Sequence, residues 1–351
     1  MSATDRYARR APTRGVRRAP ALGLGLVALC ALLALVGFLS VTMGSRSIGL
    51  GEVLRALGHV GAGDGSITST VTLEMRVPRT LLGILVGAAL GVAGAILQGV
   101  TRNPLADAGI LGINAGAAAF VVFAITVLGI SGVNAYVWFA FAGAIAALAL
   151  VYAIASLGRE GATPVKLALA GAAVTAGLTS VTSAILMTNV DALNELRFWQ
   201  VGSLAGRYAP ILTGVAPFLL LGLVVSLGLG RAINGLALGE DVARGLGQNV
   251  TRTRAAAFAL VAVLAGAATA ACGPIVFVGL VVPHVARFIC GPDYRWILPY
   301  SMLLAPVVLL LADVLGRVVV VPDELQVGVV LGLLGAPAFV AIVRYGRLSE
   351  V

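Results

Sequence analysis

Residues 76–112, RVPRTLLGILVGAALGVAGAILQGVTRNPLADAGILG, decide the fold of this chain. After two arginines and a proline, the stretch runs uncharged for the ~20 residues that a helix needs to cross the hydrocarbon of a bilayer. Gly83, Gly87 and Gly91 recur at every fourth position, so they share one helix face on which a second helix can pack closely in lipid. A polar Arg-Asn-Pro turn leads into another uncharged run. The stretch therefore predicts two packed membrane helices joined by a short loop.

The composition extends this prediction to the whole chain. Of 351 residues, 59% are hydrophobic and 11% are charged, whereas globular chains carry about 25% charged residues. This deficit indicates an integral membrane protein, and the scarce aromatics with 45 glycines favour packed helices over a β-barrel. The net charge of +9 comes from residues scattered between hydrophobic runs, which is not the pattern of a nucleic-acid-binding protein. Cys30, Cys272 and Cys290 have no metal-binding or redox spacing.

Ten apolar runs predict ten transmembrane helices. Most approach the length needed for a crossing, but the run that follows Gly273-Pro274 is short and suggests a broken or tilted helix. The runs cover approximately residues 21–43, 81–100, 109–130, 134–157, 165–188, 210–230, 255–272, 275–290, 298–320 and 326–344.

The distribution of basic residues predicts the orientation. With the N-terminus inside, most of the 24 lysines and arginines fall in inner segments, in agreement with the positive-inside rule. Residues 1–20 are then a basic cytoplasmic tail, and 346–351 a second one. The first apolar run is interpreted as a retained helix rather than a signal peptide, because no A-x-A cleavage site leads into a soluble domain.

Three connecting segments are longer than turns. Segment 44–80 is expected outside, with apolar residues at helical spacing that predict a short surface helix. Segment 191–209 is also expected outside, where Phe198 and Trp199 suit the membrane interface. Segment 231–254 is expected inside, with one short helix that ends at Gly247 and a second that begins at Asn249. Such a pair of helices would form a projecting surface to which another protein could bind.

Several chemistries are missing from the sequence. It contains no G-x-x-x-x-G-K-[ST] motif for ATP and no H-E-x-x-H motif for zinc, and Gly202-Ser203 has no buried histidine partner of the kind a membrane protease would use. A proton- or sodium-coupled carrier should hold ionisable groups in the membrane, yet Asp313 is the one acid well inside a run, and Arg317 four residues later can pair with it. The passage is therefore expected to be uncharged and driven by a separate energy-supplying subunit. Its hydroxyl groups would include Thr175, Thr179, Ser180, Thr182 and Ser183.

Seven motifs, in order along residues 45–345, point to a known family. They are R-V-P-R-T at 76–80, G-A-A-L-G-V-A-G-A-I-L-Q-G at 87–99, R-N-P-L-A-D-A-G-I-L-G-I at 102–113, L-A-L-G-E-D-V-A-R-G-L-G at 236–247, G-P-I-V-F-V-G-L-V-V-P-H-V-A-R at 273–287, L-A-D-V-L-G-R at 311–317 and E-L-Q-V-G-V-V-L-G-L-L-G-A-P-A-F at 324–339. Together they resemble the FecCD-type ABC-transporter permeases for ferric siderophores, haem and vitamin B12. One departure is Asp107-Ala108, where the family commonly has Asp-Pro.

The resemblance implies roles for particular residues. A cytoplasmic coupling helix would dock into the ATPase subunit, two inner loops would form a cytoplasmic gate, and three arginines would dock the extracytoplasmic substrate-binding protein. The coupling residues are Leu238, Gly239, Glu240, Ala243, Arg244, Leu246 and Gly247; the gate residues are Arg102, Asn103, Pro104, Leu105, Thr163 and Pro164; the docking residues are Arg76, Arg79 and Arg317. For the coupling residues an ordinary connecting loop, and for the arginines headgroup anchoring, are the alternatives.

We therefore expect an all-α polytopic protein of ten helices in two inverted repeats, with the architecture of a type II ABC-importer permease, spanning residues 21–345. It would form half of a translocation pore in a bacterial cytoplasmic membrane, with both termini inside. The partners would be a second, preferably different permease subunit, two ATPase subunits that bind ATP and magnesium, and a binding protein. No cofactor is expected in this chain.

A ferric siderophore is the expected substrate, because the R-N-P-L-A-D motif and residues 293–301 most resemble the siderophore branch, and vitamin B12 or haem is the alternative. A secondary carrier, or a receptor or scaffold, is the alternative from another class.

Overall fold

A computed structural model describes residues 18–44, 48–58, 66–130, 132–157 and 162–345, and in these ranges the regular structure is helical. The predicted terminal tails lie mostly or wholly outside the described residues. The ten helices that correspond to the predicted runs are α1 (Arg18–Thr42), α4 (Val77–Thr101), α5 (Ile113–Leu128), α6 (Val133–Ala155), α7 (Pro164–Leu186), α9 (Ala209–Gly228), α12 (Val250–Cys272), α13 (Val278–Cys290), α14 (Tyr294–Val319) and α15 (Val327–Tyr345). Shorter elements are α2 (Leu50–Gly58), α3 (Ile67–Thr70), a π-helical turn (Val71–Arg76), a 3-10 turn (Ala108–Leu111), α8 (Val190–Gln200), α10 (Gly230–Ala237) and α11 (Glu240–Gly245).

Local sequence signals explain where these helices begin. Thr163, Asn189, Asn249 and Asp293 each precede a helix and accept a hydrogen bond from a backbone N–H of its first turn. These side chains satisfy donors that have no partner inside the helix. The predicted second short helix at Asn249 is therefore wrong in length, because Asn249 caps the long helix α12 instead. The short helices of this segment are α10 and α11.

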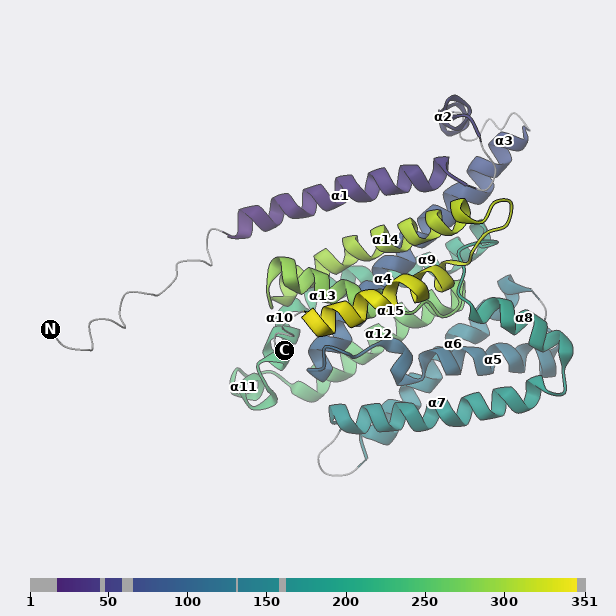
Figure 1. Ribbon diagram of the computed structural model, residues 1–351. Coiled ribbons are helices and arrows are strands. Elements are labelled where there is room, and N and C mark those ends of the chain that lie inside the picture. Colours follow the sequence, from purple (N-terminus) through teal and green to yellow (C-terminus); the bar gives the residue numbers. More distant parts are fainter. Residues whose placement is uncertain (1–17, 45–47, 59–65, 131, 158–161, 346–351) are drawn as a thin grey trace.

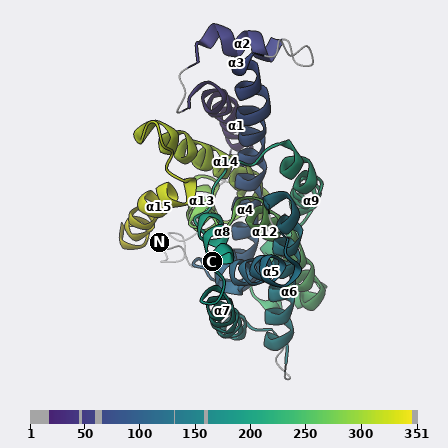
Figure 2. The same cartoon turned by 90° about the vertical axis from the view of Figure 1, so that its right-hand side faces the viewer.

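Helices α4 and α12 form the centre of the bundle (Figures 1 and 2). Most of their residues are buried, and they pack on each other and on helices from both halves of the chain. The glycine stripe of α4 lies against α14, since a Cβ atom at Gly87 would lie 2.6 Å from the Cα of Pro306, and one at Gly91 would lie 2.5 Å from the Cβ of Ala305. The predicted stripe is thus a packing face inside this chain.

The second half of the chain repeats the packing of the first half. Helix α4 packs on α14, and α12 packs in the equivalent way on α6. Likewise α5 contacts α6 and α7, whereas α13 contacts α14 and α15. Helices α4 and α12 run in opposite directions along the bundle (Figure 1). This arrangement agrees with the predicted pair of inverted repeats.

Seven of the described helices are long and apolar enough to span a membrane, and Ile113–Leu128, Val278–Cys290 and Val327–Ala341 are shorter apolar helices. We name the two ends of the bundle the α11 end, which carries α10 and α11, and the α2 end, which carries α2, α3 and α8 (Figure 1). Helices α3 and α4, with the turn between them, form one continuous helix of 35 residues. At 1.5 Å per residue it measures about 50 Å, so it extends past a hydrocarbon layer of ~30 Å.

Candidate functional site: two helix ends and an uncharged cavity

The predicted coupling helix, α11, is a single short helix at the α11 end. Two glycines with positive φ bracket it, Gly239 at 113° and Gly247 at 79°, a region that a residue without a Cβ adopts readily. Ala243 is fully buried against the bundle. Leu238 and Leu246 are 67% and 71% exposed, and the exposed Val242 lies between them at a spacing of four residues. This segment therefore turns an apolar face outward, away from the bundle that it packs against.

An ion-pair network ties α11 to the rest of this end. Glu240 accepts hydrogen bonds from Arg244, at 3.0 Å, and from Arg254 of α12, at 2.5 Å. The same Arg254 donates to the backbone carbonyl of Ala162 at 2.8 Å, one residue before Thr163. The hydrogen bond from Arg254 is the main cause that lowers the pKa of Glu240, and burial opposes it. Arg254 thus connects α11 with the predicted gate loop at Thr163-Pro164.

A second connection runs from α10 to the start of α14. The side chain of Asn234 donates to Asp293 Oδ1 at 2.7 Å, and its carbonyl oxygen accepts from the backbone N–H of Tyr294 at 2.8 Å. Asp293 itself caps α14. Burial raises the pKa of Asp293, but hydrogen bonds from Arg295 and Asn234 outweigh it and hold the pKa at about 2. A movement of α10 would therefore act directly on the end of a long membrane helix.

The predicted gate residues lie in the two loops of this same end. Arg102 ends α4 in the left-handed conformation, with φ of 51°, and is close enough to Glu240 to lower its pKa. Asn103 Oδ1 accepts from the backbone N–H of Leu105 at 2.9 Å, which closes the turn around Pro104. The structure therefore brings the predicted gate and coupling residues together at one end of the bundle.

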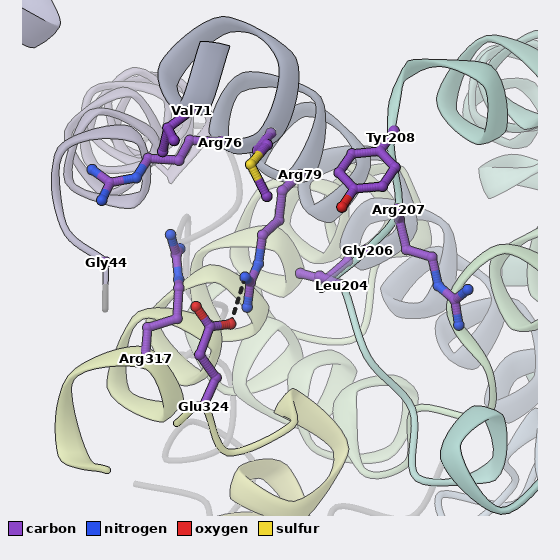
Figure 3. A pocket seen from close by; sticks show the side chains of 11 residues that line it. Gly44, Val71, Arg76, Arg79, Leu204, Gly206, Arg207, Tyr208, Arg317 and Glu324 are labelled. Carbon is purple, nitrogen blue, oxygen red and sulfur yellow. Dashed lines mark hydrogen bonds and ion pairs between the residues drawn. The ribbon is translucent and has the colours of Figure 1, made fainter. Parts of the chain in front are cut away.

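The predicted docking arginines lie at the α2 end, where they line a pocket (Figure 3). Arg79 holds Asp313 through two hydrogen bonds of 2.7 and 3.1 Å and Glu324 through one of 2.7 Å. Arg317 forms the predicted ion pair with Asp313, at 2.9 Å, and its side chain is 2% exposed. Two arginines thus share one buried carboxylate. The four-residue spacing of Asp313 and Arg317 predicted the second of these ion pairs but not the one with Arg79.

Two of these arginines also cap α1. The last carbonyls of a helix have no partner inside it and carry a partial negative charge. Arg76 donates to the carbonyls of Val41 and Thr42, and Arg317 donates to those of Ser40 and Met43, at 2.8–3.1 Å. In this conformation the docking arginines are therefore engaged with their own chain.

An uncharged cavity of about 520 Å³ runs along α7. Four of the five predicted hydroxyl residues line it, namely Thr175, Thr179, Thr182 and Ser183, whereas Ser180 does not. The hydroxyl oxygens of Thr175 and Thr182 are buried without a partner among the described residues. The cavity is therefore polar without charge, as the sequence predicted for a passage.

Some residues of these sites were not predicted from the sequence, or were predicted in the wrong place. Arg254 lies near the N-terminus of a helix, where a positive charge is unfavourable, and this position was an available signal that it binds a carboxylate. The spacing of Val242 from Leu238 and Leu246 was a second signal. Trp199 was wrongly placed in an interfacial belt: its side chain is buried, because α8 turns it toward the core, whereas the neighbouring Phe198 is exposed.

Comparison with known proteins places this geometry in a family. The sequence model of the FecCD transport family matches residues 32–345. The ferric enterobactin transport system permease protein of Escherichia coli (strain K12) is 44% identical over 90% of this chain and 93% of its own length. The Fe(3+)-citrate import system permease protein of Bacillus subtilis (strain 168) is 41% identical over 88% and 91%.

A solved structure supports the same assignment. A chain described as an inward-facing conformation of a metal-chelate type ABC transporter superposes with a TM-score of 0.79 at 27% identity, over 91% of this chain and 98% of that one. The residues that match the family include both inverted repeats, the α10–α11 segment and the arginine cluster of the α2 end. This chain is a multi-span membrane protein that belongs to the FecCD transport family.

Proposed function

We propose that this chain is the transmembrane permease subunit of an ATP-driven importer for a ferric siderophore and forms half of its translocation pore. The observation that carries the proposal is the exposed apolar surface of Leu238, Val242 and Leu246 at α11. Hydrogen bonds connect α11 with α12 and the adjacent α10 with α14. A face of this kind suits a groove on a separate ATPase subunit, which would supply the energy that the uncharged cavity cannot supply.

The orientation follows from the same proposal. The α11 end faces the cytoplasm, where the ATPases bind ATP and magnesium, and the α2 end faces outward, where a binding protein delivers the substrate. Both termini are then cytoplasmic, in the cytoplasmic membrane of a bacterium. Closing of the ATPases would move α11, and the links through Arg254 and Asn234 would pass the movement to α12, the gate loop and α14. The chain itself would break no covalent bond.

The names of the relatives favour iron chelates over cobalamin. Permeases for ferric enterobactin and Fe(3+)-citrate are 44% and 41% identical over most of this chain. A cobalamin import permease of Halobacterium salinarum is 39% identical over 77% of it, so vitamin B12 remains the alternative substrate. A second, different permease subunit would complete the pore.

Docking of the binding protein by Arg76, Arg79 and Arg317 stays a prediction with an added requirement. Because the guanidinium groups of Arg79 and Arg317 are held by Asp313, a carboxylate of the binding protein would have to displace an internal partner. Charge reversal at Arg76 or Arg79 would then weaken docking and destabilise the permease together. A docking affinity that does not change would contradict this role.

The proposal is tested at the exposed face of α11. Replacement of Leu238 and Leu246 by Asp should abolish co-purification of the ATPase and reduce substrate-stimulated ATP hydrolysis in proteoliposomes by tenfold or more. The double Met variant, which keeps the face apolar, should retain both activities. Since neither leucine packs into the bundle, the thermal stability of the isolated permease should not change. Undiminished stimulation and uptake in the Asp variant would refute the coupling role.

A further inference from the structure

A second cavity, of about 350 Å³, lies at the α2 end. Its lining comes from Arg79 of α4, from the start of α6, from α8, from the loop between α8 and α9, and from the segment before α15, whose Glu324 pairs with Arg79. Trp199 is the one residue that also lines the uncharged cavity along α7. Trp199 therefore lies between the two cavities, and in the proposed orientation the 350 Å³ cavity is at the outward-facing end of the bundle.

Three polar atoms of this cavity are buried without a hydrogen-bond partner among the described residues: Arg207 Nε, Trp199 Nε1 and Glu195 Oε2. A buried donor or acceptor left in this state costs about 1–3 kcal/mol, and more for a charged group, so native proteins tolerate few of them. Here two donors and one acceptor line the same space. Their common location indicates a site that is completed by something outside the chain.

Arg207 is the unusual member of this group. It is 7% exposed, and the part of the chain that the structure describes gives it no ion pair, although the Tyr136 hydroxyl lies within reach. Figure 3 shows its guanidinium turned away from Arg79 and Glu324. By contrast, Arg79 and Arg317 at the same end share the carboxylate of Asp313. The protein thus neutralises Arg79 and Arg317 internally and leaves Arg207 to face a cavity.

We propose that this cavity is a subsite for the ligand shell of the transported chelate, in which Arg207 and Trp199 donate hydrogen bonds to chelate oxygens and Glu195 accepts one from an N–H or O–H group. The guanidinium fork suits carboxylate, catecholate or hydroxamate oxygens, which it can grip in two places. The volume falls in the range of small-molecule sites. This inference deepens the proposed function and rests on it.

The occupant is an oxygen-rich chelate rather than a bare cation. Among the described residues no group of three or more His, Cys, Asp or Glu side chains could hold a metal ion. Arg79 and Glu324 of the lining pair with each other, and the remaining guanidinium of Arg207 repels a bare cation and attracts negative or carbonyl oxygen. Glu195 adds selectivity, because its carboxylate disfavours a purely anionic surface and favours a chelate that also carries amide or hydroxyl groups.

Trp199 provides a direct probe of occupancy. The chain has three tryptophans, so replacement of Trp138 and Trp296 by Phe leaves Trp199 as its sole indole. The complete transporter, with its partner subunits freed of tryptophan, would be placed in nanodiscs and titrated with ferric citrate, a ferric triscatecholate and a ferric trihydroxamate. A free tryptophan analogue would correct for light absorbed by iron. We expect at least one chelate to quench Trp199 saturably.

Variants of Arg207 decide whether the quench reports this subsite. Arg207→Gln should weaken the quenching chelate tenfold or more, and Arg207→Lys, which keeps the charge, should weaken it less. The matched control is Arg197→Gln on the exposed side of α8, which removes the same charge outside the cavity and should leave the affinity unchanged. The inference is overturned if no chelate quenches saturably, or if Arg207→Gln binds like the parent.

Uptake measurements separate this inference from the proposed function. In proteoliposomes, Arg207→Gln should raise the KM of chelate uptake tenfold while kcat falls less than twofold, because the subsite acts in capture. If it lowers kcat and thermal stability but not affinity, Arg207 is structural and the inference fails. If the parent transporter imports no ferric chelate at all, the proposed function fails, and the quench titration still decides whether the cavity binds one.

Discussion

At the α2 end, the buried Arg317 and the largely buried Arg79 share the buried carboxylate of Asp313, whereas at the α11 end the exposed Arg244 shares the half-exposed Glu240 with Arg254. Both clusters join two arginines through one acid. They differ in how far solvent reaches the charged groups. Loss of one member strongly destabilises a buried cluster, whereas an exposed ion pair contributes about 1 kcal/mol or less to the folding free energy. The α2 end is therefore built to hold helices together, and the α11 end to move against a partner.

The largest effect is expected from the shared acid of the α2 end. Asp313→Asn leaves the buried Arg317 without its carboxylate, while Arg79 keeps Glu324; this should cost about 3–5 kcal/mol of folding free energy. The variant should lose thermal stability in detergent, measured by the melting temperature of the purified chain. Glu324→Gln is the control, because its carboxylate binds the same Arg79 but is partly exposed, so its loss should be much smaller. Equal losses would contradict the central role of Asp313.

This comparison also shows what the sequence could predict. The limits of the long helices followed from composition, because ~20 apolar residues in lipid have few alternatives to a helix. The pair Asp313–Arg317 was predictable because four residues bring two side chains to one helix face. Its third member, Arg79, lies far away in the sequence and is joined only when α4 packs against α14. A partner that depends on tertiary packing carries no local signal.

The residues of the proposed subsite illustrate the same limit. Trp199 beside an exposed Phe198 on a polar helix has the composition of an interfacial belt, and only the turn of α8 against the bundle shows which ring is buried. The hydroxyl residues of α7 were predictable because they recur within one apolar run. The lack of an ion pair at Arg207 among the described residues was not predictable, because it depends on how the whole fold packs.

The second prediction sharpens the contrast at the α11 end. Arg254→Gln cuts the link between Glu240 and the carbonyl of Ala162, so the ATPase should still bind but uptake per ATP hydrolysed should fall several-fold. Arg254→Lys, which can reach one partner at a time, should lie between this variant and the parent. The measurement is the ratio of chelate imported to phosphate released in proteoliposomes. An unchanged ratio would mean that α11 and the gate loop move independently.

A smaller effect is expected where α10 meets α14. Asn234→Ala removes a hydrogen bond to Asp293 and leaves the N–H of Tyr294 without its acceptor. The loss should be about 1–2 kcal/mol, since one of the two bonds involves a charged group. A melting curve of the purified chain measures it. Asn234→Asp is the comparison: it can still accept from Tyr294 but places a second carboxylate beside Asp293, and it should be at least as destabilising as the Ala variant.

The smallest effect is the pH dependence of the Asp293 cap. Its folded-state pKa of about 2 lies below the ordinary value of 3.8, so the carboxylate stabilises the folded chain above pH 3.8, and this stabilisation is lost as the pH falls through about 2. The difference in melting temperature between the parent and Asp293→Asn should therefore stay constant from pH 7 to pH 4 and shrink below it. Asp241→Asn, an exposed acid of α11, should show no comparable change. A difference that stays constant down to pH 2 would show that hydrogen bonds from Arg295 and Asn234 do not lower the pKa of Asp293. It would also remove the reason for regarding α10 as fixed to α14.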